Sequence, residues 1–136
     1  MAVNKPFFVK NGLNVNDNLS ISSGGLVDIK TGANIASAST LNLDAATGNR
    51  VHITGTTTIA AVILTRGPRT LIFDDILTLT HHATYNNLPG AADITTAPGD
   101  RAIYESDGTT VYCVSYFRAS GVAAIEPILF YSIGVN

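Results

Sequence analysis

Two adjacent pairs of titratable residues, Asp74-Asp75 and His81-His82, are the groups in this sequence best suited to chemistry. Carboxylates and imidazoles both bind divalent transition metals, so a metal site built from the two pairs is one interpretation. Adjacent residues of a strand point to opposite faces, however, so both histidines would reach one ion only at a bend. We favour histidines at strand ends or on the surface.

The carboxylate pair has a second interpretation, as general acid and base of a glycoside hydrolase. That chemistry needs two carboxyl groups at a set separation across a cleft. Neighbours within a turn rarely provide this geometry, so we expect Asp74-Asp75 to be a turn.

Two single residues complete the chemical candidates. His52 lies between Val51 and Ile53, and three copies of its ring around a three-fold axis would ligate an ion or stack; the simpler interpretation is a solvent-facing strand residue. Cys113 is the only cysteine, which excludes an intrachain disulfide and a cysteine-based zinc cluster. No histidine or basic residue flanks it, so we expect a small buried hydrophobic residue and no catalytic thiolate.

Established catalytic and phosphate-binding motifs (GxSxG, GxxxxGK[ST], HExxH and GxGxxG) do not occur in the chain. We therefore expect a protein that is not an enzyme and uses no cofactor and no metal, and we assign no catalytic residues. The tyrosines at 104, 112, 116 and 131 either line a shallow glycan-binding surface or pack in a core, and core packing is favoured.

The composition points to burial of apolar surface in an assembly. Hydrophobic residues make up 46% of the 136 residues and charged residues 13%, against a usual charged share of roughly 25%. The 8 basic and 10 acidic residues are scattered singly, so nucleic acid is not an expected partner. No apolar stretch resembles a secretory signal or reaches the ~20 residues of a membrane span. We expect a protein made and kept soluble in a cytoplasm, with no membrane partner.

The first half of the chain repeats a short pattern of two apolar residues around a polar one, which predicts short strands with one buried face. The spacing between successive repeats is irregular, which argues against a strict β-solenoid and favours association of strands from several copies. We refer to these five triplets as dyads: Leu13-Asn14-Val15, Leu19-Ser20-Ile21, Val27-Asp28-Ile29, Leu41-Asn42-Leu43 and Val51-His52-Ile53.

Longer strands are predicted from residue 61 onward. Asp107-Gly108 predicts a hairpin whose second strand has Val111, Cys113 and Ser115 on one face and Tyr112, Val114 and Tyr116 on the other. Pro127 predicts an edge position or a bulge in the last strand region. The expected strands cover residues 62–65, 70–73, 76–80, 94–96, 101–105, 109–117 and part of 122–135.

Together these patterns predict an all-β fold: an extended N-terminal β arm followed by a small β-sandwich or barrel-like knob, in an intertwined homotrimer. The expected divisions are a docking arm at 1–25, a short-strand trimerising region at 26–60 and a β knob at 61–136.

Several stretches resemble structural proteins of tailed bacteriophages, including cyanophage-type virions. They are the opening MAVNK (residues 1–5) followed by FVKNGLNV (residues 8–15), the region 31–59 with VHITGTTTI, and the segments 77–81, 88–90, 94–96, 99–100, 114–116 and 118–121. This resemblance implies a homotrimeric, non-enzymatic virion protein and brings no catalytic residues with it.

Within that class, the short chain favours a capsid decoration (cement) protein that stabilises the shell. The arm would dock on the major capsid protein or other virion proteins, with further contacts between copies, through Phe7, Phe8, Val9, Leu13 and Val15. One alternative is a short tail or head fibre adhesin that binds a host surface glycan through loops 84–90 or 97–100. Another, less favoured, is a small glycan depolymerase that uses Asp74 and Asp75.

Overall fold

The computed structural model describes residues 8–20 and 27–123. Strands account for nearly all of the regular structure in these ranges, which confirms the all-β prediction. None of the described residues forms a helix long and apolar enough to cross a bilayer. The elements are β1 (Ile35–Ala36), β2 (Thr40–Asn42), β3 (Arg50–Thr54), β4 (Ala61–Ile63), β5 (Arg69–Phe73), β6 (Thr78–Leu79), the 3-10 turn η1 (Pro89–Ala91), β7 (Ile94–Thr95), β8 (Arg101–Ser106) and β9 (Val111–Phe117).

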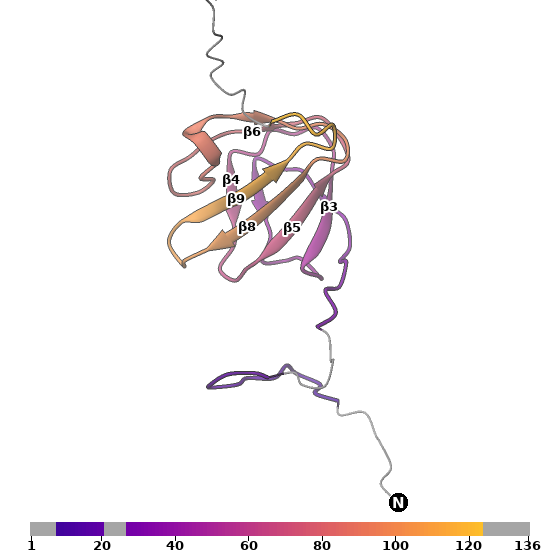
Figure 1. Ribbon diagram of the computed structural model, residues 1–136, viewed down its shortest axis with the longest axis vertical. Helices are drawn as coiled ribbons and strands as arrows, with labels where there is room; N and C mark the ends of the chain where they lie inside the picture. Colours follow the sequence, from indigo (N-terminus) through magenta and orange to yellow (C-terminus); the bar gives the residue numbers. More distant parts are fainter. Residues whose placement is uncertain (1–7, 21–26, 124–136) are drawn as a thin grey trace, which may run out of the picture.

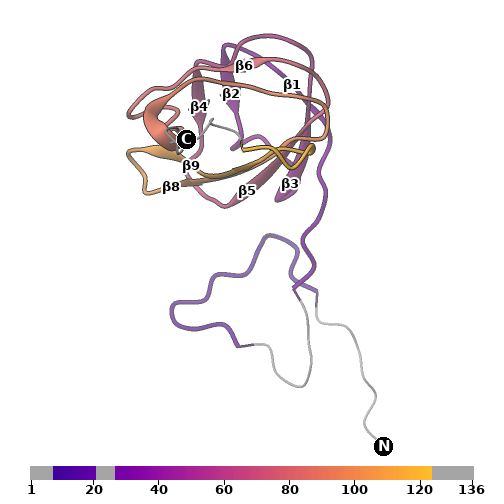
Figure 2. The ribbon, with the colours of Figure 1, turned by 45° about the horizontal axis from the view of Figure 1, so that its top comes forward.

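The strands form a β body, residues 31–119, in which sheets enclose a core. One sheet has five strands in the order β1-β3-β5-β8-β9, and two smaller sheets pair β2 with β4 and β6 with β7. Figure 2 shows the five-stranded sheet curving along one side, with β2 and β4 opposite it and β6 crossing the top. Strands that precede residue 60 pair with strands that follow it: β3 pairs with β5, and β2 pairs with β4.

Residues 31–79 are wound as stacked coils with parallel strands. Ile35 pairs with Ile53, and Ile53 pairs in turn with Phe73. On the opposite side of the core, Leu41 pairs with Val62. We call the coils first (β1, β2), second (β3, β4) and third (β5, β6). From the uneven spacing of the dyads we do not expect stacked coils. The strands nevertheless stack in register, because the loops that connect them differ in length and absorb the uneven spacing.

Side chains bond each coil to the next. Asp44 accepts from the backbone nitrogen and the hydroxyl of Thr65, at 2.8 and 3.0 Å. Asp75 accepts from the nitrogen of Gly55 at 2.7 Å, and Gly55 has a φ of 86° that favours glycine. These bonds hold the turns of successive coils in line.

The hairpin predicted at Asp107-Gly108 is present between β8 and β9. Its face pattern differs from the prediction: Ile103 pairs with Ser115 and Tyr104 with Cys113, so a β-bulge inserts Val114 and reverses the alternation. Tyr116 therefore packs against the core and stacks on Phe73, with ring centroids 6.1 Å apart.

The core lies within a single copy of the chain. The dyads at 41–43 and 51–53 are among its members, so their burial does not need the second copy that the sequence suggests. Tyr104 is fully buried and donates from its hydroxyl to Oδ1 of buried Asn86 at 2.9 Å. The buried apolar residues are Leu41, Leu43, Val51, Ile53, Ile59, Val62, Leu64, Leu71, Phe73, Leu77, Leu79, Leu88, Ile94, Ala102, Tyr104, Val111 and Cys113.

The other three dyads do not form strands where the structure describes them. Leu13-Asn14-Val15, Leu19-Ser20 and Val27-Asp28-Ile29 have no regular secondary structure and are exposed, which corrects the prediction of strands there. Their apolar residues lack a facing layer in one copy. Ile21, Phe7 and the last strand region beyond residue 123, with Pro127, lie outside the described residues.

Candidate interaction surface

The N-terminal segment, residues 8–20 and 27–30, presents apolar side chains to solvent. Phe8 is 84% exposed, Leu13 62% and Leu19 65%. Figure 1 shows this segment extending away from the β body. Of the predicted docking residues, Phe8, Val9, Leu13 and Val15 are all exposed.

The five-stranded sheet and the β2–β4 sheet each end in an open edge at the first coil. Among the described strands, β1 is terminal in the five-stranded sheet, and β2 pairs with β4 alone. Thr31 and Gly32 extend the β1 edge, where the nitrogen of Gly32 donates to the carbonyl of Arg50 at 2.8 Å. Backbone groups on the outer side of such edge strands can pair with a further strand.

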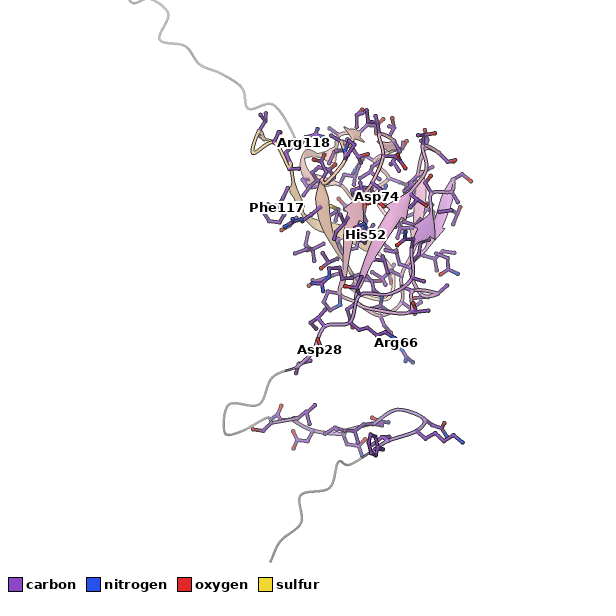
Figure 3. The ribbon with its side chains drawn as sticks, turned by 90° about the vertical axis from the view of Figure 1, so that its right-hand side faces the viewer. Asp28, His52, Arg66, Asp74, Phe117 and Arg118 are labelled. Atoms are coloured by element: carbon purple, nitrogen blue, oxygen red, sulfur yellow. The ribbon has the colours of Figure 1, made fainter. Side chains whose placement is uncertain are left out.

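His52 and Asp74 form an ion-pair geometry on the outer face of the five-stranded sheet, visible in Figure 3. Nδ1 of His52 lies 2.6 Å from Oδ1 of Asp74, and both side chains are more than one-third exposed. Asp75 instead bonds the turn at Gly55. The two adjacent carboxylates therefore bind different partners and do not face each other across a cleft.

The adjacent histidines His81 and His82 stabilise local turns. Nδ1 of His82 accepts from the nitrogens of Thr84 and Tyr85, both at 3.1 Å, and its ring stacks on Tyr85. Nδ1 of His81 accepts from the nitrogen of Leu88 at 3.2 Å. Within residues 8–20 and 27–123, no group of three His, Cys, Asp or Glu side chains could hold a metal ion.

Cys113 is a core residue that pairs with Tyr104 across β8 and β9, and it is only 5% exposed. Burial raises the pKa of its thiol to about 12. The thiolate needed for nucleophilic chemistry is therefore scarce at neutral pH.

A buried carboxylate joins the end of β9 to the turn before β8. Asp100 accepts at Oδ2 from Ala97, Tyr116 and Arg118 at 2.9, 2.7 and 2.8 Å, and at Oδ1 from Ala119 at 2.9 Å. Burial alone would raise its pKa, but these hydrogen bonds together lower it. The sequence places Asp100 in a turn and gives no sign of its partner Arg118.

The two loops proposed for glycan binding hold structural residues. Loop 84–90 contributes buried Asn86 and Leu88, and loop 97–100 contributes buried Asp100. A shallow pocket of about 240 Å³ lies beside the second loop, and none of the described residues that line it is a carboxylate. Its lining consists of Gly99, Arg101, Phe117, Arg118 and Ala119.

No protein-family profile, curated protein or solved structure matches the chain. The functional interpretation therefore depends on the molecule itself, and its most distinctive surface is the exposed apolar N-terminal segment next to a body with open sheet edges.

Proposed function

We propose that this chain is a non-enzymatic structural protein of a phage virion, acting as a homotrimeric capsid decoration protein whose N-terminal segment docks on neighbouring subunits. The observation that carries the proposal is the set of exposed apolar side chains in that segment. Exposed apolar residues gathered in one segment are typical of a surface that a partner covers. The resemblance of several stretches to phage structural proteins supports the virion assignment. The exposed residues are Phe8, Val9, Leu13, Val15, Leu19, Val27 and Ile29.

The free energy of docking favours binding of several N-terminal segments at once over binding of a single one. Burying one of these side chains is worth about 1.5–3 kcal/mol, whereas ordering each residue costs about 1–2 kcal/mol. One extended segment therefore gains little net free energy from docking. A trimer that docks three segments at once binds a lattice with much higher avidity, because the second and third contacts are intramolecular.

The arrangement of the titratable groups supports a role without catalysis. Asp74 binds His52 while Asp75 binds a turn, so neither has the facing carboxylate that glycoside hydrolysis needs. Both histidines of the 81–82 pair accept backbone hydrogen bonds through Nδ1.

The proposal is tested on particles of the phage that encodes the chain. We expect a virion map to place the protein on the capsid in hundreds of copies. Tens of copies or fewer, at the tail or on the head, would identify the fibre alternative instead, and absence from the particle would overturn both.

The docking segment is tested with the full chain and stripped particles. The variant Phe8→Ser/Val9→Ser should keep the circular dichroism of the β body but lose attachment to particles. The matched control Lys10→Ser/Asn11→Ser changes neighbouring polar positions and should attach like the unmodified protein. Attachment by the first variant at unmodified strength contradicts the docking role.

A further inference from the structure

We propose that residues 13–20 of one copy form an additional coil on the first coil of a second copy, pairing in parallel with β1 and β2. This inference rests on the proposed function, because it names the contact through which copies associate. It predicts that each copy donates one segment and accepts another.

The sequence of the N-terminal segment continues the register of the stack. Val15 precedes Ile35 by the same interval that separates Ile53 from its paired residue Phe73, an interval two residues longer than the one from Ile35 to Ile53. Leu19 likewise precedes Leu41 by nearly the interval from Leu41 to its partner Val62. The segment therefore has apolar residues at nearly the spacing that the stacked strands use.

The side-chain pattern also fits the exposed end of the stack. Ile35, Ile53 and Phe73 occupy one column of paired positions, and repeating the Ile53–Phe73 interval before Ile35 would place Val15 next in this column. Ile35 is only partly buried although it packs against the core, so the end of the column is open. An apolar residue stacked there would cover it.

The open edges supply the backbone partners. β1 and β2 are short strands, and each is terminal in its sheet among the described residues. An extended segment with alternating apolar residues can add to such an edge, gaining main-chain hydrogen bonds and side-chain burial together.

A second copy is the occupant we infer, because the segment of the same copy lies elsewhere. Leu13 and Asn14 line a shallow pocket of about 440 Å³ with Arg66, which belongs to the turn between β4 and β5. In this position Leu13, Val15 and Leu19 stay exposed. The donated segment, residues 13–20, and the accepting edge of β1 and β2 are different surfaces, so the contact between copies is head-to-tail. If each copy is rotated by one-third of a turn relative to the previous one, three copies form a closed trimer.

Disulfide trapping tests the pairing in the full chain. In the variant Asn14→Cys/Asn34→Cys the new thiols are in register, and paired strands lie about 5 Å apart, within disulfide range. We expect mild oxidation to give covalently linked dimers and trimers. The control Asn14→Cys/Asp107→Cys places the second cysteine at an exposed hairpin position. It should give at least about tenfold less covalently linked dimer and trimer. Native Cys113 is buried and contributes little.

A charge placed on the stacking face tests the same contact without a cross-link. Val15→Asp should shift the protein from trimer to monomer in light scattering, because it puts a carboxylate on the apolar column. Asn14→Asp adds the same charge at the adjacent position, on the opposite face, and should leave the trimer intact.

The outcomes separate this inference from the proposed function. A trimer in the unmodified protein with no excess cross-linking over the control overturns the coil pairing and leaves the virion role standing. Disulfides formed only within one chain overturn it too, because they assign the coil to its own copy. Capsid attachment as a stable monomer also overturns the pairing, whereas a trimer with linked chains but no place on the particle overturns the virion role alone.

Discussion

The hydroxyl of Tyr116 donates a hydrogen bond of 2.7 Å to Oδ2 of Asp100, an oxygen that also accepts from Arg118 at 2.8 Å. The bulge in β9 makes this contact possible, because it turns Tyr116 toward the core side of the sheet. Asp100 is 1% exposed, so its carboxylate depends on these partners in place of water.

Replacing this carboxylate by an amide should destabilise the fold. We expect Asp100→Asn to lower the free energy of unfolding at pH 7 by about 2 kcal/mol, since bonds from a cation and a hydroxyl to a charged acceptor are lost or weakened. Urea denaturation measures the change. Asp107→Asn, at the exposed hairpin turn, is the control, and equal stability of the two variants would contradict the importance of Asp100.

Stability should decline in acid. The folded-state pKa of Asp100 is lowered below its ordinary value, and those of Asp44 and Asp107 are lowered as well, chiefly by backbone hydrogen bonds from Thr65 and Thr110. The unfolded chain therefore takes up protons first as pH falls. The stabilisation is present above about pH 5 and is lost below about pH 4. Melting temperatures between pH 7 and pH 3 test this, and Asp100→Asn should show a shallower decline.

The buried hydroxyl of Tyr104 should contribute more to the free energy of unfolding than the exposed hydroxyl of Tyr112. Tyr104→Phe leaves Oδ1 of Asn86 without its donor in the core, and we expect a loss of about 1–3 kcal/mol in the free energy of unfolding. Tyr112→Phe removes a hydroxyl that bonds exposed Asp107 at 3.2 Å, and its cost should be within about 0.5 kcal/mol. A reversed order would show that Asn86 finds another partner.

Cys113 should be unreactive in the folded protein. The residue is 5% exposed and the pKa of its thiol is raised to about 12 by burial, so a thiol reagent at pH 8 should label it only after unfolding. Labelling followed by absorbance, in buffer and in urea, measures this. Ser106→Cys at the end of β8 provides a more accessible control, and rapid labelling of native Cys113 would show that the core opens easily.

The antiparallel half of the fold could be predicted from local sequence. Asp107-Gly108 joins two runs of alternating residues, and such a hairpin depends only on neighbouring residues. The bulge at Val114 could not be predicted, because the residues around it alternate without interruption. It accompanies the packing of Tyr116 on Phe73, which lies on β5, far earlier in the chain.

The parallel half is harder to predict. Residues 51–53 and 41–42 are correctly predicted as strand residues, whereas buried Leu43 lies just after β2, and the partners of these strands lie a full coil away along loops of varying length. The same apolar pattern at 13–15 and 27–29 gives no strand in one copy, since burial depends on a neighbour that local sequence does not specify. The His52–Asp74 contact likewise joins residues that only the coil register brings together.

The first and second coils pair through β1–β3 and β2–β4, and the second and third through β3–β5 and the Ile59–Leu79 bridge, so the coil is a natural unit for changing chain length. Duplication of one complete coil would insert a whole turn and keep the pairing above and below it, whereas insertion of half a coil would place loops where strands should pair. Genetic gain or loss in this half is therefore best tolerated in whole turns, which would lengthen or shorten the molecule along the stack without altering its cross-section.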